Sequence, residues 1–533
     1  MPAGTELYHG RGTNETVKGP EWVAFEPEHA LNFAWQMDFR PPPSDSEGAN
    51  GPADWPSKNH DESESEAGSD DRRKHPSTKW HVHAEVYKRL VQSPMMPPGD
   101  DSHMQHGGPQ YPFAGPGGGG PGGHERKPGY LHTFRARHPL NLLYVDGLSA
   151  GKSSKGTMDV QDEILEVYND DNGDDIMMGE YARAQYFCHG LARDRWDGKI
   201  DGFIRMEHGF EIIMCDFQRS FEAVSISKAH EGADARFSDS SGTLESIGFW
   251  KEISARYNWI GSQGIGGGRA VIDYERMITA WQYADDNDLL DGEGDDENPL
   301  HRVNKLPTSA KEAMFSDIEA MVHSLSMTRT SGINWQAVTD MITTRYSDRL
   351  HQLAYGAIYT TKEQFDFEAT LLLRPFVNHD ARNKTAELER CSTHFFPSAP
   401  YPPSVAAEAI SKISKRVCKT FQDALEVSSS SPSAFETVRG MYQDLVEQLE
   451  WTTWKECRGC AYDEICFTAI WPTGSLEDHL RPSCKNGTAI SQSHGYWGGF
   501  GGPPGGGKGP GGGKGPGDGK GPGEGRGPRG PGP

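Results

Sequence analysis

The segment Lys199–Phe217, KIDGFIRMEHGFEIIMCDF, decides how the first part of the chain folds. It holds two apolar runs, DGFIRM and FEIIMCDF, which a short connection joins and which are typical of two neighbouring strands. A carboxylate, Glu211, stands at the start of the second, mostly apolar run. This position predicts one of two situations. Either Glu211 faces water in a hairpin, or it is held at a strand end because a ligand binds there.

Short strands and helices surround this segment. Apolar periodicity predicts helices at 159–168 and 178–193, and a further helix with Pro27 in its first turn. The predicted strands read LYHG, EWVAF, YLHTFRA, NLLYVDG, DGFIRM, FEIIMCDF and EAVSIS. Because strands and helices do not alternate regularly, we expect an α+β N-terminal domain with a small mixed or antiparallel sheet, formed by residues 1–39 plus 129–230.

The remaining sequence divides by composition. Residues 40–128 are rich in Gly, Pro, Ser and acidic residues and are predicted to be a mostly disordered insertion. A helical period returns later in the chain, where about five helices are expected. The predicted parts are a connecting segment with an acidic loop at 231–300, an all-α domain at 301–450, a cysteine-containing module at 451–490 and a disordered Gly-rich tail at 491–533.

Composition also limits the partners and the compartment that we expect. The formal net charge of −23 argues against a nucleic-acid or membrane-surface binder, since phosphates are bound by clustered Lys and Arg. No signal peptide and no transmembrane segment are predicted. Eight cysteines in 533 residues do not suggest a disulfide scaffold. We therefore expect a cytoplasmic or nuclear protein. Sequons at Asn14, Asn383 and Asn486 matter only if the chain enters the secretory route.

Three segments of the N-terminal part stand in a characteristic order. The first is the strand motif Tyr8-His9-Gly10-Arg11, the second is EWVAFEPEHALNFA from Glu21, and the third is DGFIRMEHGFEIIMCDF from Asp201. Together they resemble the ADP-ribosyltransferase fold, in its His-containing, PARP-like branch. The resemblance covers residues 5–39 and 130–228. It implies a protein that uses NAD as a substrate.

By this resemblance, Glu211 is the catalytic acidic group. Cleavage of the bond between nicotinamide and ribose passes through an oxocarbenium-like state, which a nearby carboxylate stabilises. The same carboxylate would hold the ribose 2′-hydroxyl. Glu207, four residues earlier, is the alternative functional acid, and a hairpin carboxylate is the alternative interpretation of Glu211.

The resemblance also implies roles for residues near the first two motifs. His9, the second catalytic residue, would hydrogen-bond the adenosine ribose, and the backbone of Gly10 would bond the nicotinamide carboxamide, where only glycine permits close approach. Tyr8 and Arg11 flank this pair and belong to the predicted NAD site, as does Phe25, which could stack on the ligand. The family often has Ser, Thr or Tyr at the stacking position. A strand-end histidine satisfied by the backbone is the alternative for His9.

The predicted function is NAD-dependent ADP-ribosyl transfer or NAD glycohydrolysis, with a nucleotide and an unknown protein acceptor as partners. A non-catalytic interaction protein that retains the fold is the alternative. A weaker alternative is a P-loop-like nucleotide-binding enzyme, because Gly151-Lys152-Ser153 looks like the end of a Walker A motif. The glycine that this motif needs five residues before Gly151 is replaced by Asp146.

The cysteine-containing module offers a possible metal site. Cys457, Cys460, Cys466 and Cys484 have the spacing C-x2-C-x5-C-x17-C, which suits a structural zinc site. Only one pair has the usual spacing, so two disulfides or unlinked thiols stay open as alternatives, and each role is structural. This module and the run DGLSAGKSSKGTMDVQDEI from Asp146 resemble uncharacterised protein families of filamentous fungi.

Overall fold

The computed structural model describes most of the predicted folded parts. The described residues are 1–37, 126–165, 180–229, 247–251, 268–291, 300–326, 331–397, 401–430 and 434–497, except for the single positions 32, 154, 208, 249 and 458. The predicted insertion up to residue 125, most of the acidic loop and the Gly-rich tail from residue 498 lie outside the described residues. Residues 491–497, the start of the predicted tail, are described, and Ser493 and Trp497 are buried there.

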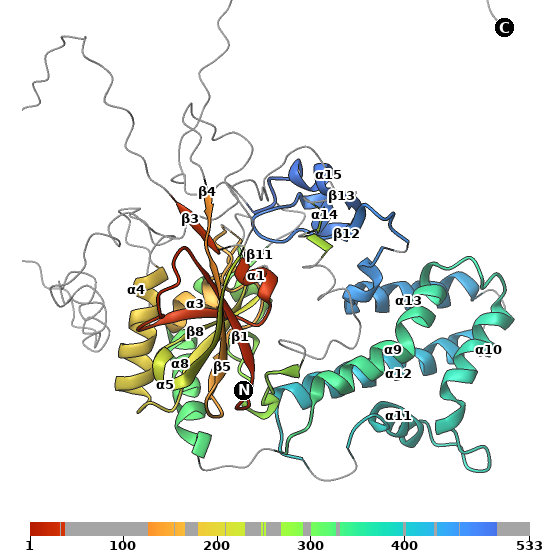
Figure 1. Ribbon diagram of the computed structural model, residues 1–533. Coiled ribbons are helices and arrows are strands. Elements are labelled where there is room, and N and C mark those ends of the chain that lie inside the picture. Colours follow the sequence, from red (N-terminus) through yellow and green to blue (C-terminus); the bar gives the residue numbers. More distant parts are fainter. Residues whose placement is uncertain are drawn as a thin grey trace, which may run out of the picture. The chain divides into compact units, whose positions relative to one another are not determined.

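A seven-stranded sheet forms the centre of the N-terminal part (Figure 1). Its strand order is β6-β7-β8-β2-β1-β5-β9. Strands β6 and β7 are parallel, and the other neighbouring pairs are antiparallel. The strands are β1 (Glu6–Arg11), β2 (Glu21–Ala24), β5 (Tyr130–Ala136), β6 (Leu142–Tyr144), β7 (Gly202–Met206), β8 (Phe210–Met214) and β9 (Phe221–Lys228). The prediction of a mixed sheet within an α+β domain is therefore confirmed.

Successive side chains of β8 lie on opposite faces of this sheet, as the pleat of a strand requires. Ile212 and Met214 join one buried cluster, whereas Ile213 packs in a second cluster with Phe203 and Phe187. Glu211 therefore shares the face of Ile213, which is the face covered by helices.

Four helical segments cover that face: α3 (Asp159–Ile164), α4 (Glu180–Gln185), the π-helix η1 (Tyr186–Arg195) and α8 (Thr308–His323) (Figure 1). The apolar stripe of α8 packs against η1 and the sheet through Met314, Phe315, Ile318 and Val322. The predicted all-α domain counted α8 with the helices that follow it. Periodicity shows that a helix has an apolar stripe, but it does not show which core that stripe joins.

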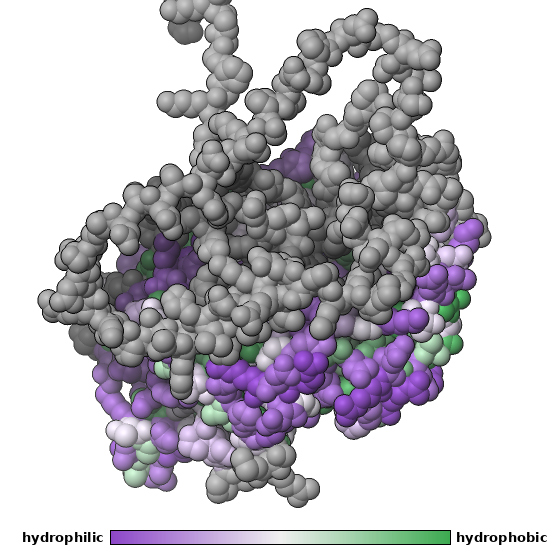
Figure 2. Space-filling model, turned by 90° about the vertical axis from the view of Figure 1, so that its left-hand side faces the viewer, coloured by the Kyte–Doolittle hydropathy of each residue, from purple (hydrophilic) through white to green (hydrophobic). Residues whose placement is uncertain are grey.

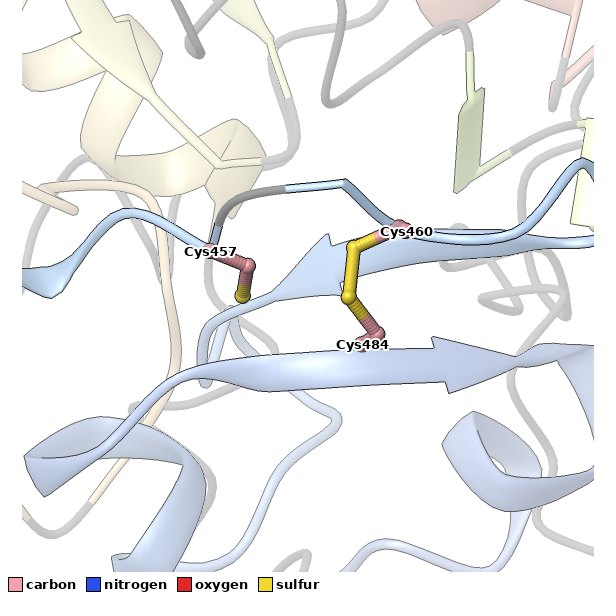
Figure 3. Close-up of side chains that lie close together, drawn as sticks. All are labelled: Cys457, Cys460 and Cys484. Carbon is pink, nitrogen blue, oxygen red and sulfur yellow. A yellow bond between two sulfur atoms is a disulfide. The ribbon is translucent and has the colours of Figure 1, made fainter.

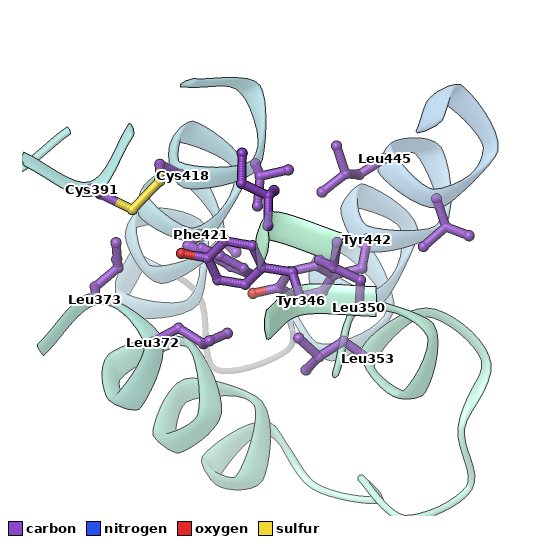
Figure 4. Close-up of a cluster of buried hydrophobic side chains, with 14 of the residues drawn as sticks. Tyr346, Leu350, Leu353, Leu372, Leu373, Cys391, Cys418, Phe421, Tyr442 and Leu445 are labelled. Atoms are coloured by element: carbon purple, nitrogen blue, oxygen red, sulfur yellow. A yellow bond between two sulfur atoms is a disulfide. The ribbon is translucent and has the colours of Figure 1, made fainter. Parts of the chain in front are cut away.

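The helices that follow have a separate core (Figure 4). They are α9 (Trp335–Tyr355), α10 (Lys362–Leu373), α11 (Lys384–Thr393), α12 (Val405–Ser430) and α13 (Phe435–Leu449). Tyr346, Phe421 and Tyr442 are completely buried among aliphatic side chains. The aromatic residues predicted in the stripe of α9, Trp335 and Tyr346, are thus core packing, whereas Met341 is 49% exposed and lies outside this core.

Short elements complete the described chain. In the C-terminal module, β12 (Glu464–Phe467) pairs with β13 (Ser483–Asn486), and Trp250 packs against Phe467. The remaining elements are α1 (Pro27–Leu31), β3 (Trp35–Met37), β4 (Arg126–Pro128), α5 (Phe217–Ser220), η3 (Tyr274–Arg276), η4 (Ala280–Gln282), α7 (Asp286–Leu289), β10 (Leu290–Asp291), β11 (Leu300–His301), η5 (Val303–Lys305), η6 (Ser324–Ser326), η7 (Arg374–Phe376), η8 (Thr452–Lys455), α14 (Leu476–Leu480) and α15 (Gly487–Ser491).

The surface that Figure 2 shows is mostly hydrophilic where its atoms belong to described residues, with scattered hydrophobic side chains. None of the helices in the described part of the chain combines the length and the apolar character that crossing a bilayer demands.

All eight cysteines form disulfides: Cys188–Cys215, Cys391–Cys418, Cys457–Cys466 and Cys460–Cys484. The expectation that so few cysteines would not form a disulfide scaffold is therefore wrong. The cysteines of the first two pairs are far from one another in the sequence and meet only because helix and strand packing brings their Cα atoms to 5.0 and 6.0 Å.

A first prediction concerns the contact between α1 and β1. A Cβ atom on Gly10 would lie 1.9 Å from the backbone oxygen of Ala30, so Gly10→Ala forces α1 away from the strand. We expect the free energy of unfolding to fall by about 1–3 kcal/mol, measured by urea denaturation.

Gly440→Ala is the matched control, because a Cβ atom there meets no heavy atom within 4 Å and the residue lies inside α13. It should raise the free energy of unfolding by up to about 1 kcal/mol, since alanine favours helix. Equal effects of the two substitutions would contradict the close packing of α1.

Candidate functional site

Glu211 lies in a row of residues that crosses four strands. In the register of the sheet, Tyr8 faces Ala24, Ala24 faces Glu211, and Glu211 faces Arg205. Directly opposed side chains of antiparallel strands share one face. The tight connection between β7 and β8 therefore places the Arg205 guanidinium against the acid, and its Nε donates to Glu211 Oε1 at 2.5 Å.

Helix α1 brings an imidazole to the same acid. His29 Nε2 lies 3.7 Å from Glu211 Oε2, and both side chains are buried. The helix reaches this position because Gly10 has no side chain in the path of Ala30. Helix α3 contacts the partner of the acid: Gln161 Oε1 accepts a hydrogen bond of 3.4 Å from the Arg205 guanidinium. The acid is thus enclosed by strand, helix and loop residues.

The electrostatics of this cluster keep Glu211 ionised. Burial by itself would raise the pKa of Glu211, but Arg205, His29 and Lys152 outweigh this effect and lower the pKa from 4.5 to about 2. The residue is only 4% exposed, so its charge is stabilised by these partners and not by water. An ionised, water-shielded carboxylate is suited to stabilise a cationic transition state.

His9 lies on β1 and is 3% exposed. Its ring meets the ring of Trp22 edge-on, with 4.7 Å between centroids, and Trp22 in turn contacts the ring of His29 at 5.9 Å. The pKa of His9 is lowered from 6.5 to about 3, first by burial and then by Arg11 and His132. The imidazole is therefore neutral near pH 7. His9 alternates with Tyr8 along β1, so the pleat of the strand turns it away from the face that carries Glu211. Ring contacts through Trp22 link His9 to His29, the neighbour of Glu211.

The other predicted NAD-binding residues take different positions. Tyr8 is half-buried in the row of Glu211, and Arg11 donates to the backbone oxygen of Glu15 at 3.4 Å. The Cα of Gly10 is covered by the backbone of α1. Phe25 is completely buried in the cluster of Ile212 on the opposite face of the sheet, so its expected stacking role in the cluster around Glu211 requires a correction: the side chain of Phe25 is core.

Sequence reasoning missed His29, Arg205 and Trp22. Arg205 could have been found, because a tight hairpin around Gly209 sets it opposite Glu211. Periodicity gave no such signal for His29, whose position depends on how α1 packs on the sheet. Glu207, the alternative acid, lies just past the end of β7 and is 3% exposed, so both predicted acids are buried at the same hairpin.

The loop after β6 contributes Lys152. Backbone bonds hold this loop to the end of β7, where Ala150 N–H donates to Met206 O at 2.9 Å. Lys152 is 4% exposed, and its backbone oxygen accepts a 2.8 Å hydrogen bond from the indole of Trp471 in the C-terminal module. Helix α3 begins only at Asp159, so Gly151-Lys152-Ser153 does not open a helix as a phosphate-binding P-loop does.

The four cysteines of the predicted metal site form two disulfides, one of the alternatives that the sequence left open. Figure 3 shows the Cys460–Cys484 bond, with Cys457 beside it. The sulfurs of Cys457, Cys460 and Cys484 lie within 4.8 Å of one another, which suits a common metal ion once they are thiolates. The zinc hypothesis therefore applies to the reduced module alone.

These features define a mixed α+β domain with a buried cluster of charged and imidazole groups, joined to helical and disulfide-bonded parts. Residues 109–236 match the family model described as YPL277C N-terminal domain. This match spans strands β4 to β9 and includes Arg205, Glu211 and Lys152.

Two proteins of Saccharomyces cerevisiae are similar to the chain. Uncharacterized protein YOR389W is 24% identical over 421 residues, which are 65% of this chain and 65% of that protein. Uncharacterized protein YPL277C is 39% identical over 94 residues, which are 16% of this chain and 18% of that protein. The chain thus spans less than two thirds of the length of either relative. No solved structure matches it. The similarity is to fungal proteins, and none of these names states an activity.

A second prediction concerns the buried ion pair. Arg205→Met leaves Glu211 without its main counter-charge, so we expect the free energy of unfolding to fall by about 3–5 kcal/mol. The double substitution Arg205→Met with Glu211→Gln should recover part of this loss, because no unpaired carboxylate remains. Urea denaturation measures both. Arg135→Met is the control: it breaks surface pairs with Glu6 and Glu222, which water already screens, and should lower the free energy of unfolding much less than Arg205→Met.

A third prediction concerns pH. The pKa of His9 is about 3 in the folded chain and 6.5 in the absence of structure, so the unfolded chain binds the proton first as the pH falls. The stability associated with neutral His9 is full above pH 6.5 and is lost as the pH falls from 6.5 toward 3. His9→Gln should therefore weaken the acid sensitivity of unfolding between about pH 7 and pH 5. His379→Gln, on an exposed loop, should leave the profile unchanged.

Proposed function

We propose that the N-terminal α+β domain acts on NAD, by ADP-ribosyl transfer or by NAD glycohydrolysis. The observation that carries the proposal is the buried cluster around Glu211, in which Arg205, His29 and Lys152 keep the acid ionised. Its residues come from the segments that resemble the ADP-ribosyltransferase family. Glu211 and His9 are the proposed catalytic residues, and Tyr8 and Gly10 remain in the proposed NAD site.

The proposed chemistry is a substitution at the anomeric carbon of the nicotinamide ribose. The bond from this carbon to the nicotinamide nitrogen breaks, and nicotinamide leaves with the electron pair. A new bond forms to the oxygen of water or to an acceptor group, which gives up its proton. Glu211 stabilises the positive charge that develops on the ribose and holds the 2′-hydroxyl. Neutral His9 offers one donor and one acceptor nitrogen for the adenosine ribose.

The proposed reaction requires that NAD can reach this buried cluster. Glu211, His9 and His29 are each less than 5% exposed, so NAD reaches them only when a covering element moves. Helix α1 carries His29 to Glu211, and it is only five residues long. A shift of this helix would break the contacts of His29 with Glu211 and Trp22 and would uncover Gly10.

The second candidate is an interaction protein that retains the fold without catalysis. Two observations favour it: Phe25 is committed to the core, and Glu211 is already neutralised by Arg205. In this case the cluster is a structural ion pair. A P-loop-like enzyme is the weakest alternative, because Gly151-Lys152-Ser153 does not open a helix. In that case Lys152 would determine the binding of ATP or GTP.

A fourth prediction tests the NAD proposal. Purified full-length protein, with its disulfides intact, should deplete NAD and release nicotinamide, both measured by chromatography. Glu211→Gln removes the charge but not the shape of the side chain, and we expect turnover to fall by about 10²–10³-fold. Glu436→Gln, an exposed residue of α13, is the matched control and should leave turnover unchanged.

The alternatives have different outcomes in the same experiment. Equal turnover in wild type and Glu211→Gln would rule out the proposed role of this acid. No binding of NAD in calorimetry would favour the interaction protein. Binding of ATP or GTP that is lost in Lys152→Ala would favour the P-loop alternative.

A further inference from the structure

The eight cysteines bear on where this protein folds. Each is paired, and the four pairs have Cα separations of 5.0, 6.0, 5.3 and 5.3 Å, within the range of native disulfides. Cys391 and Cys418 are completely buried in the core of the helical part. Bonds inside a core form during folding, because a closed core excludes an oxidant that arrives later. Thiols of cytosolic proteins are kept reduced, whereas secretory compartments oxidise them.

We propose that the protein folds on the secretory route and carries N-linked glycans on Asn14 and Asn383, but not on Asn486. The proposal replaces the expected cytoplasmic or nuclear location, and it does not depend on the proposed NAD chemistry. The three positions are the sequons N-E-T, N-K-T and N-G-T. A sequon acts as a glycan acceptor where it lies on the surface of a secreted protein.

Asn14 meets this condition in the connection between β1 and β2. Residues 13–16 are all exposed, which includes the whole sequon. The loop is held by its backbone, since the Thr13 carbonyl lies 2.9 Å from His132 Nε2 and the Glu15 carbonyl accepts from Arg11. The Asn14 side chain can therefore carry a large group without disturbing these contacts.

Asn383 meets the same condition in front of α11. Residues 378–385 are exposed, and Asn383 Oδ1 accepts a hydrogen bond of 3.0 Å from Ala386 N–H. This bond uses the amide oxygen alone. The amide nitrogen, to which a glycan is attached, remains available, so the residue can cap the helix and carry a sugar at once.

Asn486 does not meet the condition. It is half-buried at the end of β13, and the next residue of the sequon, Gly487, is buried. Cys484, two residues earlier, is bonded to Cys460 across the strand pair. A glycan on Asn486 would have to fit into this cross-linked module, so selective use of the three sequons follows from their surroundings.

Both covalent steps balance with co-reactants of the secretory compartment. For each disulfide, two thiols lose their protons, and the electron pair passes to a disulfide-bearing oxidoreductase, which is reduced. For each glycan, a bond forms between the asparagine Nδ2 and the anomeric carbon of a lipid-diphosphate-linked oligosaccharide. The bond from that carbon to the diphosphate breaks, the lipid diphosphate leaves, and Nδ2 loses one proton.

The experiment uses the native protein with a C-terminal affinity tag, isolated from the cells that produce it. Free thiols are labelled with a mass-shifting maleimide before any reductant is added. Half of the sample is then treated with an N-glycosidase and compared by gel mobility. We expect no maleimide label before reduction, and a gain in mobility after glycosidase that corresponds to two glycans.

Substitutions assign the positions. Asn14→Gln and Asn383→Gln should each remove one of the two mobility steps, and Asn486→Gln should remove none. Asn378→Gln is the matched control, because Asn378 is exposed but outside any sequon. Unchanged mobility of the wild type after glycosidase overturns the proposal, and so does maleimide labelling of the cysteines before reduction. A glycan found on Asn486 overturns the selectivity derived from burial.

Discussion

The N-terminal domain buries the negative charge of Glu211, and its packing must supply positive charge around that carboxylate. A carboxylate with 4% exposure is stable as an ion only if cations replace its lost water. The partners of Glu211 come from three places: Arg205 from the neighbouring strand, His29 from α1 and Lys152 from the loop after β6. The register of β7 against β8, the packing of α1 on Gly10 and the path of the loop must therefore all be correct at once.

The same constraint bears on function in two opposite ways. A carboxylate held ionised away from water suits a reaction that develops positive charge, because its stabilising effect is not screened by solvent. A carboxylate already neutralised by a guanidinium also suits a purely structural role. The contact between Glu211 and His29 distinguishes the two roles, because the short helix α1 makes it and the sheet does not. In the catalytic role this contact opens when α1 moves to admit NAD. In the structural role it stays closed.

Much of the fold could be predicted from local pattern. The strands YLHTFRA and FEIIM and the helices of the α-helical part follow from periodicity and composition, which act over a few residues. Of the predicted site residues, Glu211 and His9 are both buried, but the pleat of β1 turns His9 away from the face of Glu211, and Phe25 is core. Alternation along a strand shows that two residues share a face, but it does not show which face meets the helices.

By itself, the sequence determined that an acid begins a mostly apolar strand, that imidazoles occur early in the chain, and that cysteines and sequons are present. Only the tertiary structure decided which groups meet. His29 reaches Glu211, all eight cysteines pair, and α8 joins the sheet instead of the later helices. Except for Cys457–Cys466, which are nine positions apart, these contacts join residues distant in the chain. Such contacts depend on the packing of whole elements, which short-range patterns do not specify.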